Sequence, residues 1–128
     1  MINFKIYIIS CIFLLNTFVF ADLIRPISGD ELNYIHVLFE WEQEPDAIGY
    51  NLQVSTQQFF NNLILDVDEL STVYIDKDNI NWNDNYYWRV RPLLDCDDCE
   101  YGAWIDQSSF STGGTSFQNI DVDIYEEE

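Results

Sequence analysis

Three segments of the chain alternate large apolar or aromatic residues with polar ones. They span residues 35–41, 50–56 and 86–92. A period of two residues is the signature of a β-strand that buries one of its faces. The predicted core therefore contains the inward positions of these strands, which include Trp41, Tyr50, Tyr86, Trp88 and Val90.

Shorter apolar stretches are expected to supply the remaining strands. Residues 23–27 suit an edge strand interrupted by a proline, and residues 63–65 and 72–75 suit two short strands. The acidic residues 66–69 between those two are expected to form a turn, and residues 110–112 to end the last strand. Seven short strands separated by turn residues predict an all-β, immunoglobulin-like β-sandwich.

The first 21 residues have the layout of a secretory signal peptide. A short start carrying Lys5 is followed by an apolar run over residues 6–20, and the small Ala21 ends the segment. The run is shorter than the roughly 20 apolar residues that a membrane-spanning helix needs, which argues against a retained anchor. We therefore expect removal of residues 1–21 on export, leaving no membrane span. The mature chain would be secreted to the periplasm, the cell surface or the medium.

The chain is strongly acidic. Five Lys and Arg residues stand against 23 Asp and Glu residues, which gives a net charge of −18 at pH 7. Such a charge repels phosphate backbones and anionic lipid, so we exclude nucleic acid as a partner, and also electrostatic docking to a bilayer. Mutual repulsion favours a soluble monomer. The capture of cations or of a basic partner stays open as a function of this charge.

Two cysteines would remain after export, Cys96 and Cys99, and both lie in an acidic stretch. A local disulfide, half of a zinc site and a redox dithiol are the alternatives. Acidic neighbours disfavour the thiolate that redox exchange needs, and a zinc site would find no further Cys or His ligand except His36. A disulfide that closes a tight loop is therefore the prediction.

Residue types that carry catalysis are scarce in this sequence. His36 is the single histidine, and strand alternation places it on an outward face. No phosphate-binding glycine loop, nucleophile elbow or zinc-protease motif is present, and the many carboxylates make any chosen pair uninformative. We predict no enzyme activity and no cofactor.

Residues 76–81 begin like a calcium loop, with oxygen ligands at alternate positions. Ile80 then takes the third ligand position, and neither the central glycine nor the closing glutamate is present. A turn that satisfies its own backbone is therefore favoured over a metal site. The acidic loop 95–100 is expected to bind a hard cation weakly, if it binds one.

Trp82 and Trp104 are candidates for a ligand platform. Two flat aromatic faces could bind a sugar or a peptide if both side chains are exposed together. The alternative is that they cap the ends of a small core. An exposed joint platform would favour a carbohydrate-binding role.

In the order and spacing of its motifs, the chain resembles a fibronectin type III domain of the kind found in exported bacterial multidomain proteins. Trp41 stands where that family has its second-strand core tryptophan, and Tyr86 where it has its corner tyrosine. Ile80, six residues earlier, replaces the usual leucine, and residues 102–104 with 110–112 resemble the closing strand. The recognition tripeptide Arg-Gly-Asp of some animal members is absent.

The resemblance implies a non-catalytic binding or spacer module that mediates contacts with an unknown protein or glycan. A carbohydrate-binding accessory domain and the remnant of a larger surface protein are the alternatives. The expected organisation is a signal peptide over residues 1–21, a fibronectin type III-like domain over 22–112, and an acidic segment over 113–128. This last segment could form a tail with little order, which we favour, an edge strand, or a connection to a further part.

Overall fold

The structure is a computed structural model and describes residues 21–95 and 101–114. Residues 1–20 of the predicted signal peptide, the predicted Cys96 to Cys99 bridge and the segment from residue 115 onward lie outside the described residues. None of the described residues belongs to a helix long and apolar enough to cross a membrane. The described strands are β1 (Leu23–Arg25), β2 (Asp30–Leu32), β3 (Val37–Trp41), β4 (Ala47–Ser55), β5 (Leu63–Glu69), β6 (Val73–Asp76), β7 (Asn85–Leu94) and β8 (Asp106–Thr112).

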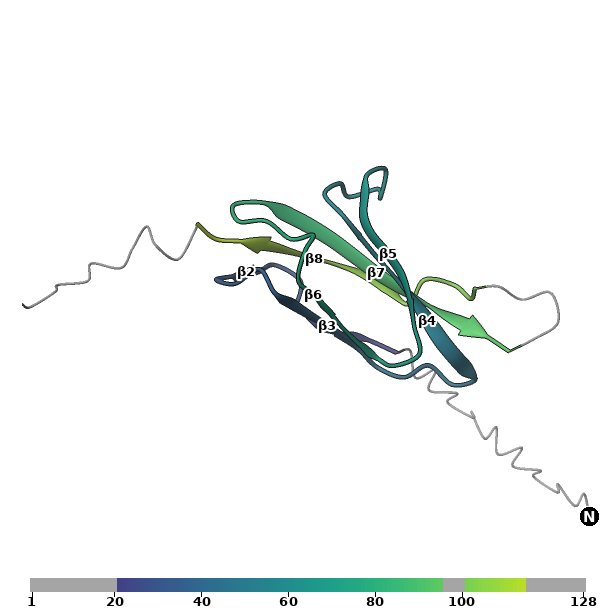
Figure 1. Cartoon of the computed structure of the whole chain (residues 1–128). Helices are drawn as coiled ribbons and strands as arrows, with labels where there is room; N and C mark the ends of the chain where they lie inside the picture. The colour runs from purple at the N-terminus through teal and green to yellow at the C-terminus, as the bar shows by residue number, and fades with distance from the viewer. Residues whose placement is uncertain (1–20, 96–100, 115–128) are drawn as a thin grey trace, which may run out of the picture.

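The strands form two sheets that face each other as two layers (Figure 1). The smaller sheet has the order β1-β3-β6, and the larger one has the order β2-β8-β7-β4-β5. Neighbouring strands run antiparallel, except that β2 runs parallel to β8. The predicted all-β sandwich is confirmed, with eight described strands in place of seven.

The eighth strand is β2, which lies beyond the predicted first strand at residues 23–27 and was not predicted. β1 pairs with β3, whereas β2 pairs with β8 through Asp30 and Phe110. Pro26 lies between them, and a residue without a backbone N–H cannot continue the ladder of hydrogen bonds. The Ile27 N–H donates to the Asp30 carboxylate at 3.1 Å, and the Asp30 N–H donates back to the Ile27 carbonyl at 3.0 Å. This turn carries the chain from one sheet to the other.

The prediction of an acidic turn at residues 66–69 is wrong, because this segment is the second half of β5. It continues the ladder with β4 as far as the pair of Tyr50 and Glu69. Asp66 and Asp68 accept hydrogen bonds from the side-chain amide of Asn51, at 2.7 and 3.0 Å. Alternate aspartates are compatible with a strand here because the neighbouring strand supplies donors for them.

The core between the sheets is rich in aromatic contacts. Phe39 packs edge to face against Trp88 and Phe110, with ring centroids 5.3 and 5.9 Å apart. Trp41 packs on Tyr50 in the same way, at 5.6 Å. The five core residues named from the sequence have these exposed fractions: Trp41 1%, Tyr50 3%, Tyr86 1%, Trp88 0% and Val90 0%.

The loop between β6 and β7 is fixed by hydrogen bonds at both of its ends. The Asn81 N–H donates to the Tyr86 hydroxyl at 2.8 Å, beside the buried Ile80, which forms the tyrosine corner of immunoglobulin-like sandwiches. Burial raises the pKa of Tyr86, although its hydrogen bond to Asn81 acts in the opposite direction. At the other end, the Asn79 N–H donates to the buried Asp76 carboxylate at 2.9 Å. The segment that begins like a calcium loop is thus a turn bonded to itself.

Candidate binding surfaces

The outward face of the larger sheet carries a ladder of arginines and aromatic rings. Arg89 and Arg91 stand on β7 at positions that alternate with the buried Trp88 and Val90 and therefore point outward. The Arg89 guanidinium lies 4.0 Å from the Phe60 ring centroid and 3.9 Å from that of Trp104. Arg91 also lies over Trp104, at 4.4 Å. Trp104 therefore links two cation–π contacts.

Amide and carboxylate side chains on β4 and β5 complete this ladder. Arg89 donates to the Gln53 carbonyl oxygen from Nε at 3.0 Å and from Nη2 at 2.8 Å. Arg91 donates from Nε to the Asn51 carbonyl oxygen at 2.9 Å. Asn51 and Gln53 in turn donate to the Asp66 carboxylate, at 2.7 and 3.4 Å. Aromatic rings, arginines, amides and carboxylates thus succeed one another from β7 to β5.

The charges of the ladder compensate each other within the sheet. Burial and the nearby Arg91 lower the pKa of Arg89, whereas Asp66 raises it. The Tyr101 hydroxyl donates to the Asp68 carboxylate oxygens at 2.9 and 3.0 Å, and this hydrogen bond is the largest cause of a raised pKa of Tyr101. Both arginines have their donors directed at neighbouring side chains. We interpret this face as a stabilising network, with little cationic surface left for an anionic ligand.

The part of Asn51 and Gln53 in this network was not predicted, although the signal for it is present in the sequence. Asn51 and Gln53 alternate with buried residues on β4, as Arg89 and Arg91 do on β7. Polar side chains at every second position of two strands can meet across a sheet if the strands are neighbours. The missing information was the pairing and register of the strands, which set Gln53 opposite Arg89 and Asn51 opposite Arg91.

A hollow of about 900 Å³ lies at the end of the sandwich where β4 begins and β7 ends. It is open to solvent on one side. The turn before β4 and the residues that precede β8 form its walls. As far as residues 21–95 and 101–114 form it, the lining combines apolar side chains with three carboxylates and contains no Lys, Arg or His. Its main side chains are Ile48, Leu94, Trp104, Ile105, Glu44, Asp46 and Asp95.

Close backbone contacts hold the walls of this hollow. The Gly102 N–H donates to the Pro92 carbonyl at 2.8 Å, which lays the segment before β8 along β7. A Cβ atom at Gly102 would come within 2.9 Å of the Pro92 side chain, so this approach requires a glycine. On the opposite wall, the Glu44 N–H donates to the hydroxyl of the buried Tyr50 at 2.8 Å. The hollow is therefore formed by backbone that is already fixed.

The two tryptophans proposed as a ligand platform stand in different places. Trp82 follows β6 and lines a hollow of about 290 Å³ with Tyr34 and His36. Trp104 borders the larger hollow beneath Arg89 and Arg91. Because the two rings line different hollows, the arrangement offers no joint platform for a sugar.

The described residues also allow a test of metal-binding geometry. Across residues 21–95 and 101–114, no group of three or more His, Cys, Asp and Glu side chains is placed to hold a metal ion. His36 is exposed, as strand alternation predicted. The proposed disulfide of Cys96 and Cys99 stays a prediction, since both lie outside the described residues.

A comparison with solved structures identifies the class of fold. The chain is similar to a Fn3-like protein from Clostridium thermocellum, with a TM-score of 0.50 and 19% sequence identity over 71% of this chain and 88% of that one. A likeness at this identity shows the fold alone. No protein-family model matches the sequence, and no curated protein matches it. The protein is thus a fibronectin type III-like β-sandwich.

Proposed function

We propose that this protein is an exported, non-catalytic binding or spacer module of the fibronectin type III type, which mediates contacts with a protein or a cell surface. The signal-like segment over residues 1–21 supports export. In the oxidising compartment that follows, Cys96 and Cys99 would form the local bridge. The observation that carries the binding role is the hollow bordered by Trp104.

The chemistry of the hollow favours binding over catalysis. Among the described residues, its lining supplies carboxylates and apolar side chains and contains no His, Cys, Ser, Lys or Tyr that could serve as a further nucleophile or proton donor. A concave apolar surface with a few polar groups at its border is typical of a recognition site. Acidic side chains without a basic neighbour in the lining favour a partner whose contacting segment is basic.

The rigidity of the walls supports the same role. Trp104 is held by two guanidinium groups, and Gly102 is held against Pro92 by a backbone hydrogen bond. A partner would therefore meet a preformed surface and would not lose affinity to the ordering of these groups.

A capture experiment with two matched variants tests the proposal. Ile48 is 52% exposed on the wall of the hollow, and Phe59 is 79% exposed in the loop after β4, at the other end of that strand. We expect the wild-type protein and Phe59→Ser to retain the same partner from the envelope and medium of their own cells. Ile48→Ser should lose it, because the substitution removes apolar contact area from the hollow.

Equal capture by all three proteins would contradict a binding role for the hollow. Catalytic turnover by the purified protein that persists in Ile48→Ser and is lost on substitution of other residues would contradict the non-catalytic role.

A further inference from the structure

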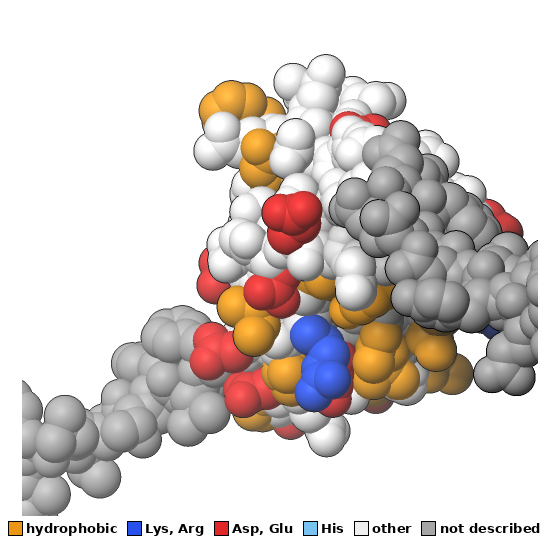
Figure 2. All heavy atoms as spheres, turned by 90° about the vertical axis from the view of Figure 1, so that its left-hand side faces the viewer, with side chains coloured by type: hydrophobic (Ala, Val, Ile, Leu, Met, Phe, Trp, Pro, Cys, Tyr) orange, Lys and Arg blue, Asp and Glu red, His pale blue; other side chains and the backbone are white. Residues whose placement is uncertain are grey.

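The outward face of the smaller sheet is apolar, and the described residues leave it uncovered. Ile24, Val73 and Ile75 are 36%, 41% and 55% exposed, and Leu38 is paired with Ile75 across the sheet. Figure 2 shows apolar side chains gathered in the lower part of one face, around a basic side chain and beside acidic ones. A contiguous apolar patch on so acidic a chain marks a contact surface.

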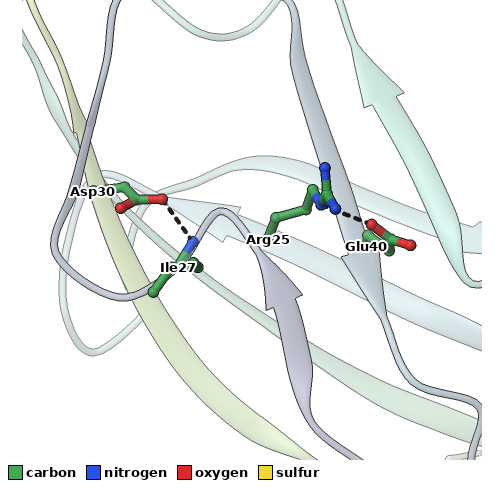
Figure 3. A network of polar contacts seen from close by, with 4 residues as sticks. All are labelled: Arg25, Ile27, Asp30 and Glu40. Carbon is green, nitrogen blue, oxygen red and sulfur yellow. Dashed lines mark hydrogen bonds and ion pairs between the residues drawn. The ribbon is translucent and has the colours of Figure 1, made fainter.

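A shallow hollow of about 460 Å³ extends this face toward the loop between β2 and β3. Ile27, Tyr34 and Leu38 line its apolar part. Arg25 lies at its border and forms an ion pair with Glu40, with Nε and Oε2 2.8 Å apart (Figure 3). The apolar patch therefore continues into a hollow at one end, and the charge of Arg25 beside it is partly neutralised by Glu40.

The last strand, β8, ends close to this hollow. Gly113, just after β8, accepts a hydrogen bond from the Asn83 N–H at 2.9 Å. Trp82, the residue before Asn83, lines a hollow together with Tyr34 and His36. Tyr34 and His36 also line the hollow on the apolar face. Two neighbouring hollows thus lead from the end of β8 to the apolar patch.

The sequence beyond Gly114 has the pattern that this face needs. Ile120, Val122 and Ile124 alternate with acidic residues at positions 121 and 123. In an extended conformation, the three apolar side chains lie on one side and the two aspartates on the other. Residues 115–119 precede this stretch and can span roughly 17 Å when extended.

We propose that residues 115–125 dock as an extended segment on the outward face of the β1-β3-β6 sheet, with Ile120, Val122 and Ile124 on the apolar patch. Among the described strands, β1 and β6 pair only with β3, so the backbone amides on their outer edges exchange with solvent unless a segment on the face shields these strands. The contact is intramolecular, which gives the segment a high effective concentration at the face. The aspartates would then point to solvent.

Charge makes this docking dependent on salt. The segment ends in three glutamates and belongs to a chain with a net charge of −18, so like-charge repulsion opposes an apolar contact. Screening over distances of about 10 Å near 0.1 M salt reduces that repulsion. Docking should therefore tighten between low and moderate salt, which is the opposite of a contact made by ion pairs.

Hydrogen–deuterium exchange of β1 and β6 tests the proposal in protein purified from cells that express the full-length chain. The first variant ends at Gly114, and the second carries Ile120→Ser, Val122→Ser and Ile124→Ser together. The matched control carries Gln118→Ser and Asn119→Ser and keeps the apolar positions. We expect amides of β1 or β6 to exchange about tenfold faster in both variants than in the wild type and the control.

Two further arms identify the occupant of the face. A synthetic peptide of residues 115–128 should restore protection to the shortened protein, and Ile75→Ser on the sheet should abolish that effect while Phe59→Ser should not. Equal exchange in all four proteins would overturn the proposal. So would protection that rises with protein concentration together with a dimer in sedimentation, because a second copy would then cover the face.

Discussion

The outward faces of the two sheets differ in how their side chains are used. On the larger sheet, Arg89 and Arg91 are enclosed by aromatic rings and directed at amide oxygens, and the amides reach the carboxylates of β5. On the smaller sheet, Ile75 and its neighbours Ile24 and Val73 are left exposed by the described residues. One face is thus closed by its own side chains, and the other is left for contact with something else.

Free energies of single interactions give this difference a scale. A hydrogen bond to a charged group contributes about 1.5–3 kcal/mol, and a cation–π contact contributes about 0.5–2 kcal/mol depending on its exposure. An isoleucine that is already half exposed gains little from folding. The polar face should therefore contribute more to stability than the apolar face, contrary to the usual association of apolar side chains with stability.

The core that both faces share should give the largest effect. Trp41→Ala removes a fully buried indole that packs on Tyr50, and we expect a loss of about 3–5 kcal/mol, enough to unfold a domain of this size. Urea denaturation or a thermal melt measures it. A cooperative melt within a few degrees of the wild type would show that the indole does not support the core.

The ladder on the larger sheet should give the next largest effect. Arg89→Ala removes two cation–π contacts and two hydrogen bonds to Gln53, and we expect a loss of about 2–4 kcal/mol in the free energy of unfolding. Arg89→Lys is the matched control, since it keeps the charge but loses the planar fork, and its loss should be intermediate. Equal losses for the two variants would mean that the charge by itself contributes nothing at this position, and no loss in Arg89→Lys would mean that charge alone matters.

Alkaline pH should weaken the corner that anchors β7. Burial raises the pKa of Tyr86 above its ordinary value of 10.0, so the native state holds this proton more tightly than the unfolded chain does. The contribution is complete below the unfolded pKa and is lost as pH rises through the folded pKa. We expect urea titrations to give a falling free energy of unfolding above pH 10.0, with a smaller slope in Tyr86→Phe. If Tyr86→Phe shows the same slope of unfolding free energy against pH as the wild type, other titrating groups cause the loss of stability.

The smallest effect on stability is expected at the border of the larger hollow. Asp46 and Asp95 are exposed, and Asp46 has a φ of 65°, which asparagine also adopts readily. The double variant Asp46→Asn and Asp95→Asn should change the free energy of unfolding by less than about 0.5 kcal/mol. It should nevertheless lower the affinity of the hollow for a basic partner. The control variant Glu31→Gln and Asp78→Asn removes the same charge from exposed positions outside the hollow. If this control loses as much affinity, net charge and not the hollow determines the binding.

Much of the fold could be predicted from the sequence because its strongest signals are local. A period of two residues located the inward positions of β3, β4 and β7, and the resemblance to fibronectin type III domains placed the corner tyrosine, Tyr86. The short strand β2 was not predicted, because pattern alone does not tell that the residues after Pro26 pair with β8 in the other sheet. The second half of β5 was misread because aspartates favour turns when they have no donors nearby.

The candidate surfaces were harder to predict for a related reason. Whether Trp82 and Trp104 face one ligand depends on where two distant loops lie, and nothing in the residues themselves encodes that. The ladder required the register of β4 against β7, and the hollow required the contact of Gly102 with Pro92. Such features arise from long-range pairing, which a single sequence without a structure does not reveal.

The contrast between the two faces can be measured directly by unfolding Arg89→Ala and Ile75→Thr side by side in urea. Ile75→Thr keeps a β-branched residue at a position that is 55% exposed, so we expect a loss of less than about 1 kcal/mol. Arg89→Ala should lose at least twice as much. If Ile75→Thr proves the more destabilising of the two, the account of a stabilising polar face and an apolar face kept for contact is contradicted.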